Sequence, residues 1–151
     1  AVAVIEQIGS QFGLNDKQWM VFRVIAGHFV AKSVLKSNDG CDQLTMLMMG
    51  PGGTGKTHVV KAVQAVMKSY GCAHLIRYLA PTGSAASLIK GMMVHKGLGL
   101  KIKSNGKGKG NRDTGESSED YSVLISVQNR TLLRDEWKNV EYLLIDEVSL
   151  V

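Results

Sequence analysis

The stretch that decides the fold runs from residue 44 to residue 57 and reads Leu-Thr-Met-Leu-Met-Met-Gly-Pro-Gly-Gly-Thr-Gly-Lys-Thr. Its first part, Leu44–Met49, is a continuous apolar run of strand length, typical of a strand buried on both faces of a parallel sheet. Its second part, residues 50–57, matches the pattern G-x-x-x-x-G-K-[ST]. Residues 54–70 then place apolar side chains at helical spacing. The sequence therefore predicts a strand, a glycine-rich loop and a helix in succession.

Such a loop binds phosphate because its glycines let main-chain N–H groups turn inward where side chains would block the ligand. The N-terminus of the following helix adds free donors and a positive dipole end. We expect Lys56 to place its charge on the β- and γ-phosphates and the Thr57 hydroxyl to bind Mg²⁺. The candidate nucleotide-binding residues of this segment are Gly50, Gly52, Gly53, Thr54, Gly55, Lys56, Thr57 and His58.

A third strand, expected to be buried, runs over residues 140–145 and ends in the carboxylate pair Asp146-Glu147. Ligands of α/β sheets bind at the carboxyl ends of the strands, so we expect Asp146 to hold Mg²⁺ together with Thr57. Glu147 is then placed to accept a proton from an attacking water. An adjacent glutamate favours hydrolysis over transfer to a small acceptor, and the predicted catalytic residues are Lys56 and Glu147.

The remaining pattern predicts an α/β fold in which a parallel sheet is flanked by helices. Asn15 is a natural N-cap for a long helix, and Gln18 stands at its third position, as in a capping box. Few apolar side chains occur over residues 101–120, which predicts an exposed, mobile insertion. Helices are expected over 4–12, 15–34, 54–70, 84–90 and 123–137, and strands over 44–49, 75–80 and 140–145.

Charge is unevenly distributed along the 151 residues, whose formal net charge is +5. Between residues 43 and 112 there are 11 Lys or Arg and no Asp or Glu, which points to a polyanionic partner. Length suits one domain, and no apolar run reaches the roughly 18–20 residues of a membrane span. Cys41 and Cys72 are expected to be reduced, without a zinc site. The chain starts without Met and stops in an apolar run, so we expect a fragment.

Five segments together resemble a known family: LNDKQ at 14–18, GPGGTGKT at 50–57, LAPTGSAA at 79–86, GMMVHKGLGL at 91–100 and EYLLIDEVSLV at 141–151. They follow one another in the order found in Pif-type DNA helicases. These enzymes are RecD-like members of helicase superfamily one and include versions encoded in Helitron transposons. The resemblance covers residues 14–151.

The resemblance implies a fold, a P-loop NTPase lobe of RecA-like type. Residues 1–40 correspond to N-terminal helices with a glutamine motif, and residues 41–151 correspond to the ATP-binding lobe. Gln18 corresponds to the glutamine that hydrogen-bonds adenine, although helix capping is a competing role for it. The implied cofactors are ATP and Mg²⁺.

The resemblance also implies contacts with DNA. The segment Pro81, Thr82, Gly83, Ser84 and Ala85 corresponds to one that touches single-strand phosphates, which small residues allow main-chain N–H groups to approach. His95 corresponds to a residue near the same groove, or is simply a polar residue at a helix start. The implied partner is single-stranded DNA, with no membrane.

The implied function is an ATP-dependent DNA helicase that couples ATP hydrolysis to translocation and unwinding, in DNA repair and recombination. The second RecA-like lobe, which supplies the arginine fingers, is absent from this chain, so we expect very slow hydrolysis from a monomer. A nuclear location, or a mitochondrial one, follows from the family alone. Two alternatives stay open: a degenerate remnant that binds without turnover, and another P-loop phosphotransferase such as a nucleotide kinase.

Overall fold

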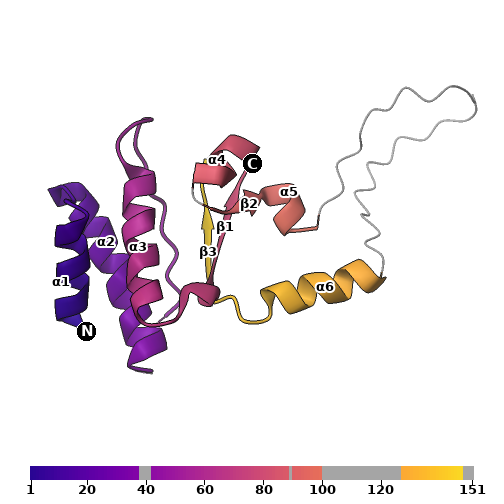
Figure 1. Cartoon of the computed structure of the whole chain (residues 1–151), viewed down its shortest axis with the longest axis horizontal. Helices are drawn as coiled ribbons and strands as arrows, with labels where there is room; N and C mark the ends of the chain where they lie inside the picture. The colour runs from indigo at the N-terminus through magenta and orange to yellow at the C-terminus, as the bar shows by residue number, and fades with distance from the viewer. Residues whose placement is uncertain (38–41, 89, 100–126, 148–151) are drawn as a thin grey trace, which may run out of the picture. The chain divides into compact units, whose positions relative to one another are not determined.

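A computed structural model describes residues 1–37, 42–88, 90–99 and 127–147 of the chain. The chain divides into two units, Ala1–Ile76 and Arg77–Val151, which are described in turn. The first unit is helical and the second holds the sheet (Figure 1). The insertion predicted at 101–120 lies outside the described residues, and the domain boundary expected at residue 40 stays a prediction.

Three helices that pack side by side make up most of the first unit (Figure 1). Their apolar side chains recur every three or four residues, which puts them on one face of each helix. Helices predicted over 4–12, 15–34 and 54–70 are thereby confirmed, with small shifts of their ends. The elements are α1 (Val2–Gln11), α2 (Asp16–Phe29), a π-helical turn η1 (Val30–Val34) and α3 (Lys56–Ser69).

The start of α2 is fixed by a reciprocal pair of hydrogen bonds. The Gln18 N–H donates to Asn15 Oδ1 at 3.0 Å, and the Asn15 N–H donates to Gln18 Oε1 at 3.0 Å. This is the predicted capping box, and it satisfies two main-chain donors that the helix itself cannot satisfy. An N-cap of this kind stabilises a helix by about 1 kcal/mol.

The core of the first unit lies between the apolar faces of its helices. Phe22 and Phe29 of α2 are fully buried, as are Val63 and Met67 of α3. Close packing reaches α1 as well, because a Cβ on Gly9 would collide with the ring of Trp19. The predicted helical faces are therefore the faces that are buried.

The strand predicted at Leu44–Met49 is wrong. The segment makes no β-pairing in the structure, and Met46, Leu47 and Met49 are 41%, 67% and 82% exposed. The physical reason is the lack of a partner: before Ile76 the described residues of the first unit include no strand, so the run has no ladder to join. An apolar run in the sequence indicates hydrophobicity. It does not show whether a second strand lies beside it.

The second unit contains a three-stranded parallel sheet in the order β2-β1-β3. Strand β1 pairs with β2 in parallel, with Leu79 opposite Met92 and Ala80 opposite Met93. This confirms the predicted α/β class with its parallel sheet, although the two-residue β2 left no sequence pattern to read. The 3-10 turn η2 (Ala73–Leu75), at the end of the first unit, leads into β1 (Ile76–Ala80). The elements that follow are α4 (Gly83–Leu88), β2 (Met92–Met93), α5 (Val94–Gly97), α6 (Val127–Trp137) and β3 (Tyr142–Ile145).

Strand β1 is the buried centre of this sheet, with Leu79 and Ala80 fully enclosed. The third strand differs from its prediction. Along β3 half-buried and exposed residues alternate, and Leu143 is 49% exposed. That alternation is typical of a strand covered on one face, whereas burial on both faces was expected.

No helix in the described part of the chain combines the length and hydrophobicity that crossing a bilayer requires.

Candidate nucleotide-binding site

The glycine-rich loop enters α3 through two residues in the left-handed region. Gly53 has φ +79° and Gly55 has φ +80°, a conformation that L side chains rarely adopt. Gly55 is also the N-cap of α3, so the helix begins at Lys56 and not at Thr54, where the apolar pattern begins. The glycines of the motif thus set where the helix starts.

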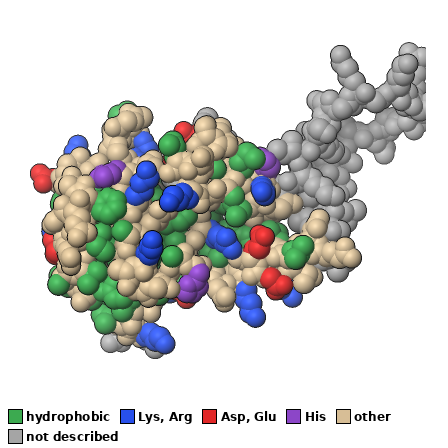
Figure 2. Space-filling view, viewed as in Figure 1, with side chains coloured by type: hydrophobic (Ala, Val, Ile, Leu, Met, Phe, Trp, Pro, Cys, Tyr) green, Lys and Arg blue, Asp and Glu red, His purple; other side chains and the backbone are tan. Residues whose placement is uncertain are grey.

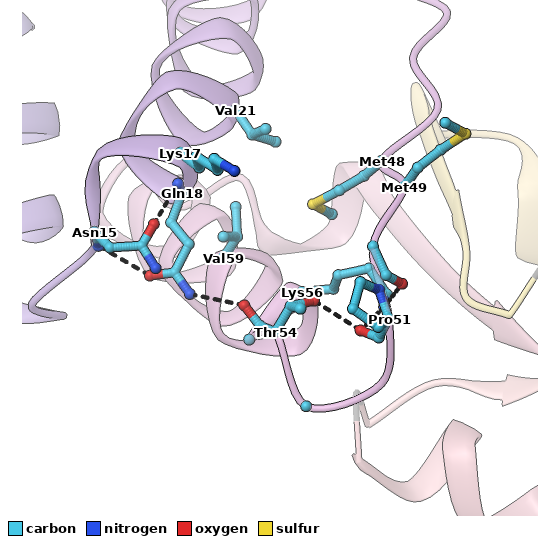
Figure 3. Close-up of a pocket in the computed structure, with 13 residues that line it drawn as sticks. Asn15, Lys17, Gln18, Val21, Met48, Met49, Pro51, Thr54, Lys56 and Val59 are labelled. Atoms are coloured by element: carbon cyan, nitrogen blue, oxygen red, sulfur yellow. Dashed lines mark hydrogen bonds between the residues drawn. The ribbon is translucent and has the colours of Figure 1, made fainter.

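Side chains of the loop close it on itself (Figure 3). Lys56 Nζ donates to the carbonyl oxygens of Gly50 at 2.8 Å and Pro51 at 3.0 Å. Thr54 Oγ1 also donates to the Pro51 carbonyl, at 2.9 Å. The lysine ammonium is therefore held over the loop, among carbonyl oxygens, and no carboxylate of the described residues is paired to it.

The main-chain N–H groups of residues 53–57 find no acceptor among the described residues. They lie at the N-terminus of a 14-residue helix, whose dipole favours an anion. A Cβ added at Gly52 or Gly53 would meet no atom within 4 Å, so open space adjoins these donors. Free donors, a dipole end, an ammonium and open space together fit a phosphate group.

A hollow of about 560 Å³ lies between the loop and the start of α2 (Figure 3). This volume is in the range of small-molecule sites. Its lining contains two lysines and no Asp or Glu, which favours an anionic ligand. Met48 points toward Val21 and Val59, whereas Met49 points away (Figure 3). The lining residues are Asn15, Lys17, Gln18, Val21, Met48, Met49, Gly50, Pro51, Gly53, Thr54, Gly55, Lys56 and Val59.

Gln18 joins α2 to the loop. Its Oε1 accepts from Asn15 N–H, and its Nε2 donates to the Thr54 carbonyl at 3.2 Å. Helix capping is thereby confirmed, and contact with adenine stays a prediction. A primary amide carries two N–H groups and two acceptor lone pairs, so one donor and one acceptor of Gln18 remain.

Three of the predicted nucleotide-binding residues, Gly52, Thr57 and His58, do not line the hollow. Thr57 is half-buried in the first turn of α3. The imidazole of His58 lies on the end of α1, where its Nε2 is 2.6 Å from the Phe12 carbonyl oxygen and the two rings are 5.5 Å apart. This side chain ties α3 to α1 in the structure.

Seven lining residues were not among the predicted site residues: Asn15, Lys17, Val21, Met48, Met49, Pro51 and Val59. Asn15 and Lys17 are next to Gln18 in the LNDKQ segment, so that segment carried a usable signal. The two methionines were assigned to a buried strand, which hid their place beside the loop.

In the second unit, Asp146 and Glu147 follow β3 directly. The Glu147 N–H donates to Asp146 Oδ1 at 2.9 Å, and Glu147 itself has φ +50°. Such a conformation costs a non-glycine residue about 1 kcal/mol or more, a form of strain that is concentrated at functional sites. Asp146 is half-buried and Glu147 is exposed, so the glutamate side chain is open to solvent.

The segment expected to contact DNA forms the start of α4. Thr82 Oγ1 accepts from the Ala85 N–H at 3.3 Å and lies 3.3 Å from Ser84 Oγ. Ala85 is buried, whereas Thr82, Gly83 and Ser84 are exposed. Both the N–H and the side chain of Ala85 are used inside the fold, which leaves the exposed three for an external contact.

Pro81 and His95 are half-buried, and His95 lies in the first turn of α5. This is the helix-start position that the sequence allowed for it.

No three His, Cys, Asp or Glu side chains gather as a metal site within the described ranges. Cys72 is a free, half-buried thiol, and Cys41 lies outside the described residues.

The loop, its helix and the parallel sheet define a P-loop nucleotide-binding protein. A family model described as the AAA domain matches residues 37–151, and the chain belongs to that family. No curated protein and no solved structure matches the chain significantly. The chain is thus an NTP-hydrolysing P-loop domain, of a class that binds nucleotide usually with a divalent metal.

Proposed function

We propose that this chain is the ATP-binding part of a Pif-type DNA helicase, with a RecA-like lobe that hydrolyses ATP as the whole protein moves along single-stranded DNA. One observation carries the nucleotide half of the proposal: the acid-free hollow that has Gln18 on one side and Lys56 on the other. The helicase half is supported by the five motif segments in their order.

Binding of a triphosphate requires Lys56 to move. Its ammonium now bonds to the carbonyls of Gly50 and Pro51, which are weaker acceptors than phosphate oxygens. Transfer of the ammonium to the β- and γ-phosphates exchanges neutral acceptors for charged ones. The N–H groups of residues 53–57 then bind the remaining phosphate oxygens.

Thr57 and Asp146 are the residues that would bind Mg²⁺, and the ion would neutralise charge on the nucleotide phosphates. Glu147 is the group that takes a proton from the attacking water. Its exposed carboxylate accepts no hydrogen bond from the described residues, so it is free for that role.

The remaining amide functions of Gln18 favour adenine over guanine. Adenine presents N7 as an acceptor beside the N6 amine as a donor, whereas guanine presents two acceptors. One free N–H and one free lone pair on the same amide match the adenine edge. Val21, Met48 and Val59 supply an apolar wall for the faces of the base.

We assign the DNA contact to the exposed residues Thr82, Gly83 and Ser84, with Lys90 and Lys96 supplying charge nearby in the sequence. Contacts of this kind go to phosphates and do not depend on base identity. The proposed partner is therefore single-stranded DNA, and the proposed location is the nucleus, or mitochondria.

The test measures ATP binding and turnover by the 151-residue chain with and without single-stranded DNA. We expect Mg²⁺-dependent ATP binding, a preference over GTP, and very slow release of inorganic phosphate, because no arginine is among the described residues that line the hollow. Absence of any nucleotide binding contradicts the proposal. Fast DNA-stimulated turnover by the 151 residues contradicts the expected slow release.

The same assay separates the alternatives. A degenerate remnant binds nucleotide but releases no phosphate, even in long incubations. A phosphotransferase moves the γ-phosphate to a nucleoside monophosphate, which radiolabelled ATP reveals as a new labelled nucleotide.

A further inference from the structure

We propose that Gln18 is a positioning residue for the phosphate loop, in addition to any contact that it makes with a base. It holds the Thr54 carbonyl and so orders the loop before a ligand binds. The expected effect of Gln18 on phosphate affinity rests on the proposed function. The ordering of the loop by Gln18 can be tested without a ligand.

Within the described part of the chain, the Gln18 amide is the only side chain outside the loop that bonds to residues 50–55. The other bonds there come from Thr54 and Lys56, which belong to the motif itself. Gln18 Nε2 reaches Thr54 O at 3.2 Å across 36 residues of sequence. Removal of this amide therefore leaves the loop with its own side-chain bonds and with the main-chain bonds that His58 and Val59 of α3 donate to the Gly55 carbonyl.

The orientation of the amide is fixed from the α2 side. Asn15 N–H donates to Gln18 Oε1 at 3.0 Å, so the oxygen faces the helix start and the nitrogen faces Thr54 (Figure 3). Asn15 uses its main chain for this bond, which the Phe22 and Ala26 core beneath α2 keeps in place. The hydrogen bond from Gln18 to the Thr54 carbonyl is thus anchored to the packed core of the first unit.

The bond also determines which way the next donor points. In a trans peptide the C=O and the following N–H lie on opposite sides, so holding Thr54 O on Gln18 turns the Gly55 N–H away from Gln18. That N–H is among the donors without an acceptor. One side-chain bond therefore presets a phosphate donor.

Gly55 shows how closely the amide approaches. A Cβ at this position would collide with Gln18 Nε2, in addition to the strain of its left-handed φ. Gly55 is therefore required both for the close approach of Gln18 and for the start of α3.

The first experiment uses ¹⁵N relaxation of the ligand-free chain to measure order parameters of Gly53, Thr54 and Gly55. Gln18→Met removes both amide bonds, whereas Gln18→Glu keeps the acceptor for Asn15 N–H and removes only the donor. We expect order parameters of about 0.85 in the wild-type chain and of about 0.6 in both variants. Gln11→Met, at the exposed end of α1, is the control and leaves the values unchanged.

Two results would overturn the proposal that Gln18 orders the phosphate loop. If neither variant lowers the order parameters, Gln18 does not order the loop. If Gln18→Met lowers them and Gln18→Glu does not, the helix cap is responsible and the donor to Thr54 is not.

The second experiment measures binding of tripolyphosphate, which has no base, at constant ionic strength. We expect Gln18→Met to raise its Kd about five-fold, the effect of one hydrogen bond, and to raise the Kd of ATP at least as much. If tripolyphosphate binding is unchanged while ATP binding weakens, Gln18 acts on the base alone and the proposal is overturned. If the wild-type protein binds neither tripolyphosphate nor ATP, the proposed function fails. The relaxation data still show whether Gln18 orders the loop.

Discussion

The main-chain N–H of Asp146 donates to the carbonyl oxygen of Leu79 at 2.9 Å. This bond continues the pairing of β3 with the buried strand β1 one residue beyond the end of β3. Asp146 is therefore held at the end of the sheet by its main chain, which leaves its carboxylate available. Oδ1 accepts from the Glu147 N–H, whereas Oδ2 accepts no hydrogen bond from the described residues.

Glu147→Gln should retain nucleotide binding and lose hydrolysis, because the amide cannot accept a proton from water. Removal of a general base costs about 10²–10⁴-fold in rate. Phosphate release per mole of bound ATP measures the effect. Glu136→Gln, on α6, is matched in charge and should hydrolyse like the wild type.

Lys56→Met should abolish measurable ATP binding, because it removes the ammonium that the structure holds at the phosphate loop. Its bonds to Gly50 and Pro51 are exposed and contribute little, so the melting temperature of the ligand-free chain should change little. Calorimetric titration with ATP and Mg²⁺ is the measurement. Lys68→Met, in the last turn of the same helix, is the control, and equal losses in both variants would contradict a specific role.

Gly91→Ala should lower the stability of the chain, whereas Gly52→Ala should hardly change it. A Cβ at Gly52 meets nothing within 4 Å, whereas a Cβ at Gly91 collides with the carbonyl oxygen of Tyr78 on β1. We expect Gly91→Ala to lower the free energy of unfolding by about 1–3 kcal/mol and Gly52→Ala to leave it nearly unchanged. Urea titrations compare them.

Gly52→Ala should nevertheless weaken ATP binding, because the methyl group takes space beside the phosphate donors. An unaltered ATP affinity in this stable variant would show that the phosphates bind elsewhere.

The ion pair between Glu6 and Arg23 should make stability depend on pH at the acidic end. Both oxygens of the carboxylate accept from the guanidinium at 2.9 Å, and this bonding lowers the pKa of Glu6 below its ordinary value of 4.5. A lowered pKa in the folded state gives stabilisation that is present above about pH 4.5 and is lost as pH falls through the folded value. Glu6→Gln should therefore lower Tm at pH 7, with a difference that shrinks below pH 4.5.

Both side chains of the pair are about half exposed, so the effect at pH 7 should be small and should fall with added salt. A Tm difference that grows toward low pH would have the wrong sign for this pair.

Lys90→Ala combined with Lys96→Ala should flatten the salt dependence of single-strand binding. Each lysine that neutralises a phosphate adds about 0.7 to the slope of log K against log salt, so two contacts predict a reduction of about 1.4. Fluorescence anisotropy at several salt concentrations measures it. The pair Lys32→Ala and Lys68→Ala removes the same charge from other elements and should leave the slope as it is.

Much of the fold follows from local pattern. The capping box at Asn15, the left-handed glycines before Lys56 and the carboxylate after β3 depend on neighbours within a few residues, and sequence spacing predicts such neighbours. The contact of Gln18 with Thr54 and that of His58 with Phe12 join residues 36 and 46 positions apart. Tertiary packing decides these contacts, and no periodicity encodes them.

The error at Leu44–Met49 has the same origin. A run of apolar residues is compatible with a strand only where a ladder exists, and the helical unit around it offers none. Strand β2 is the opposite case. Its two residues are too few to form a sequence pattern, and they form a strand because they pair with β1.

The exposed run of residues 44–49 also bears on how the protein behaves at high concentration. It is a six-residue segment with no charge, proline or glycine, and its main chain is open to pairing with the same segment of another molecule. Pro51, two residues past the run, cannot donate to a ladder and sets a stop for such stacking. We therefore expect the purified chain to self-associate through this segment as concentration rises. The variant Leu47→Lys, at the exposed centre of the run, should stay dispersed.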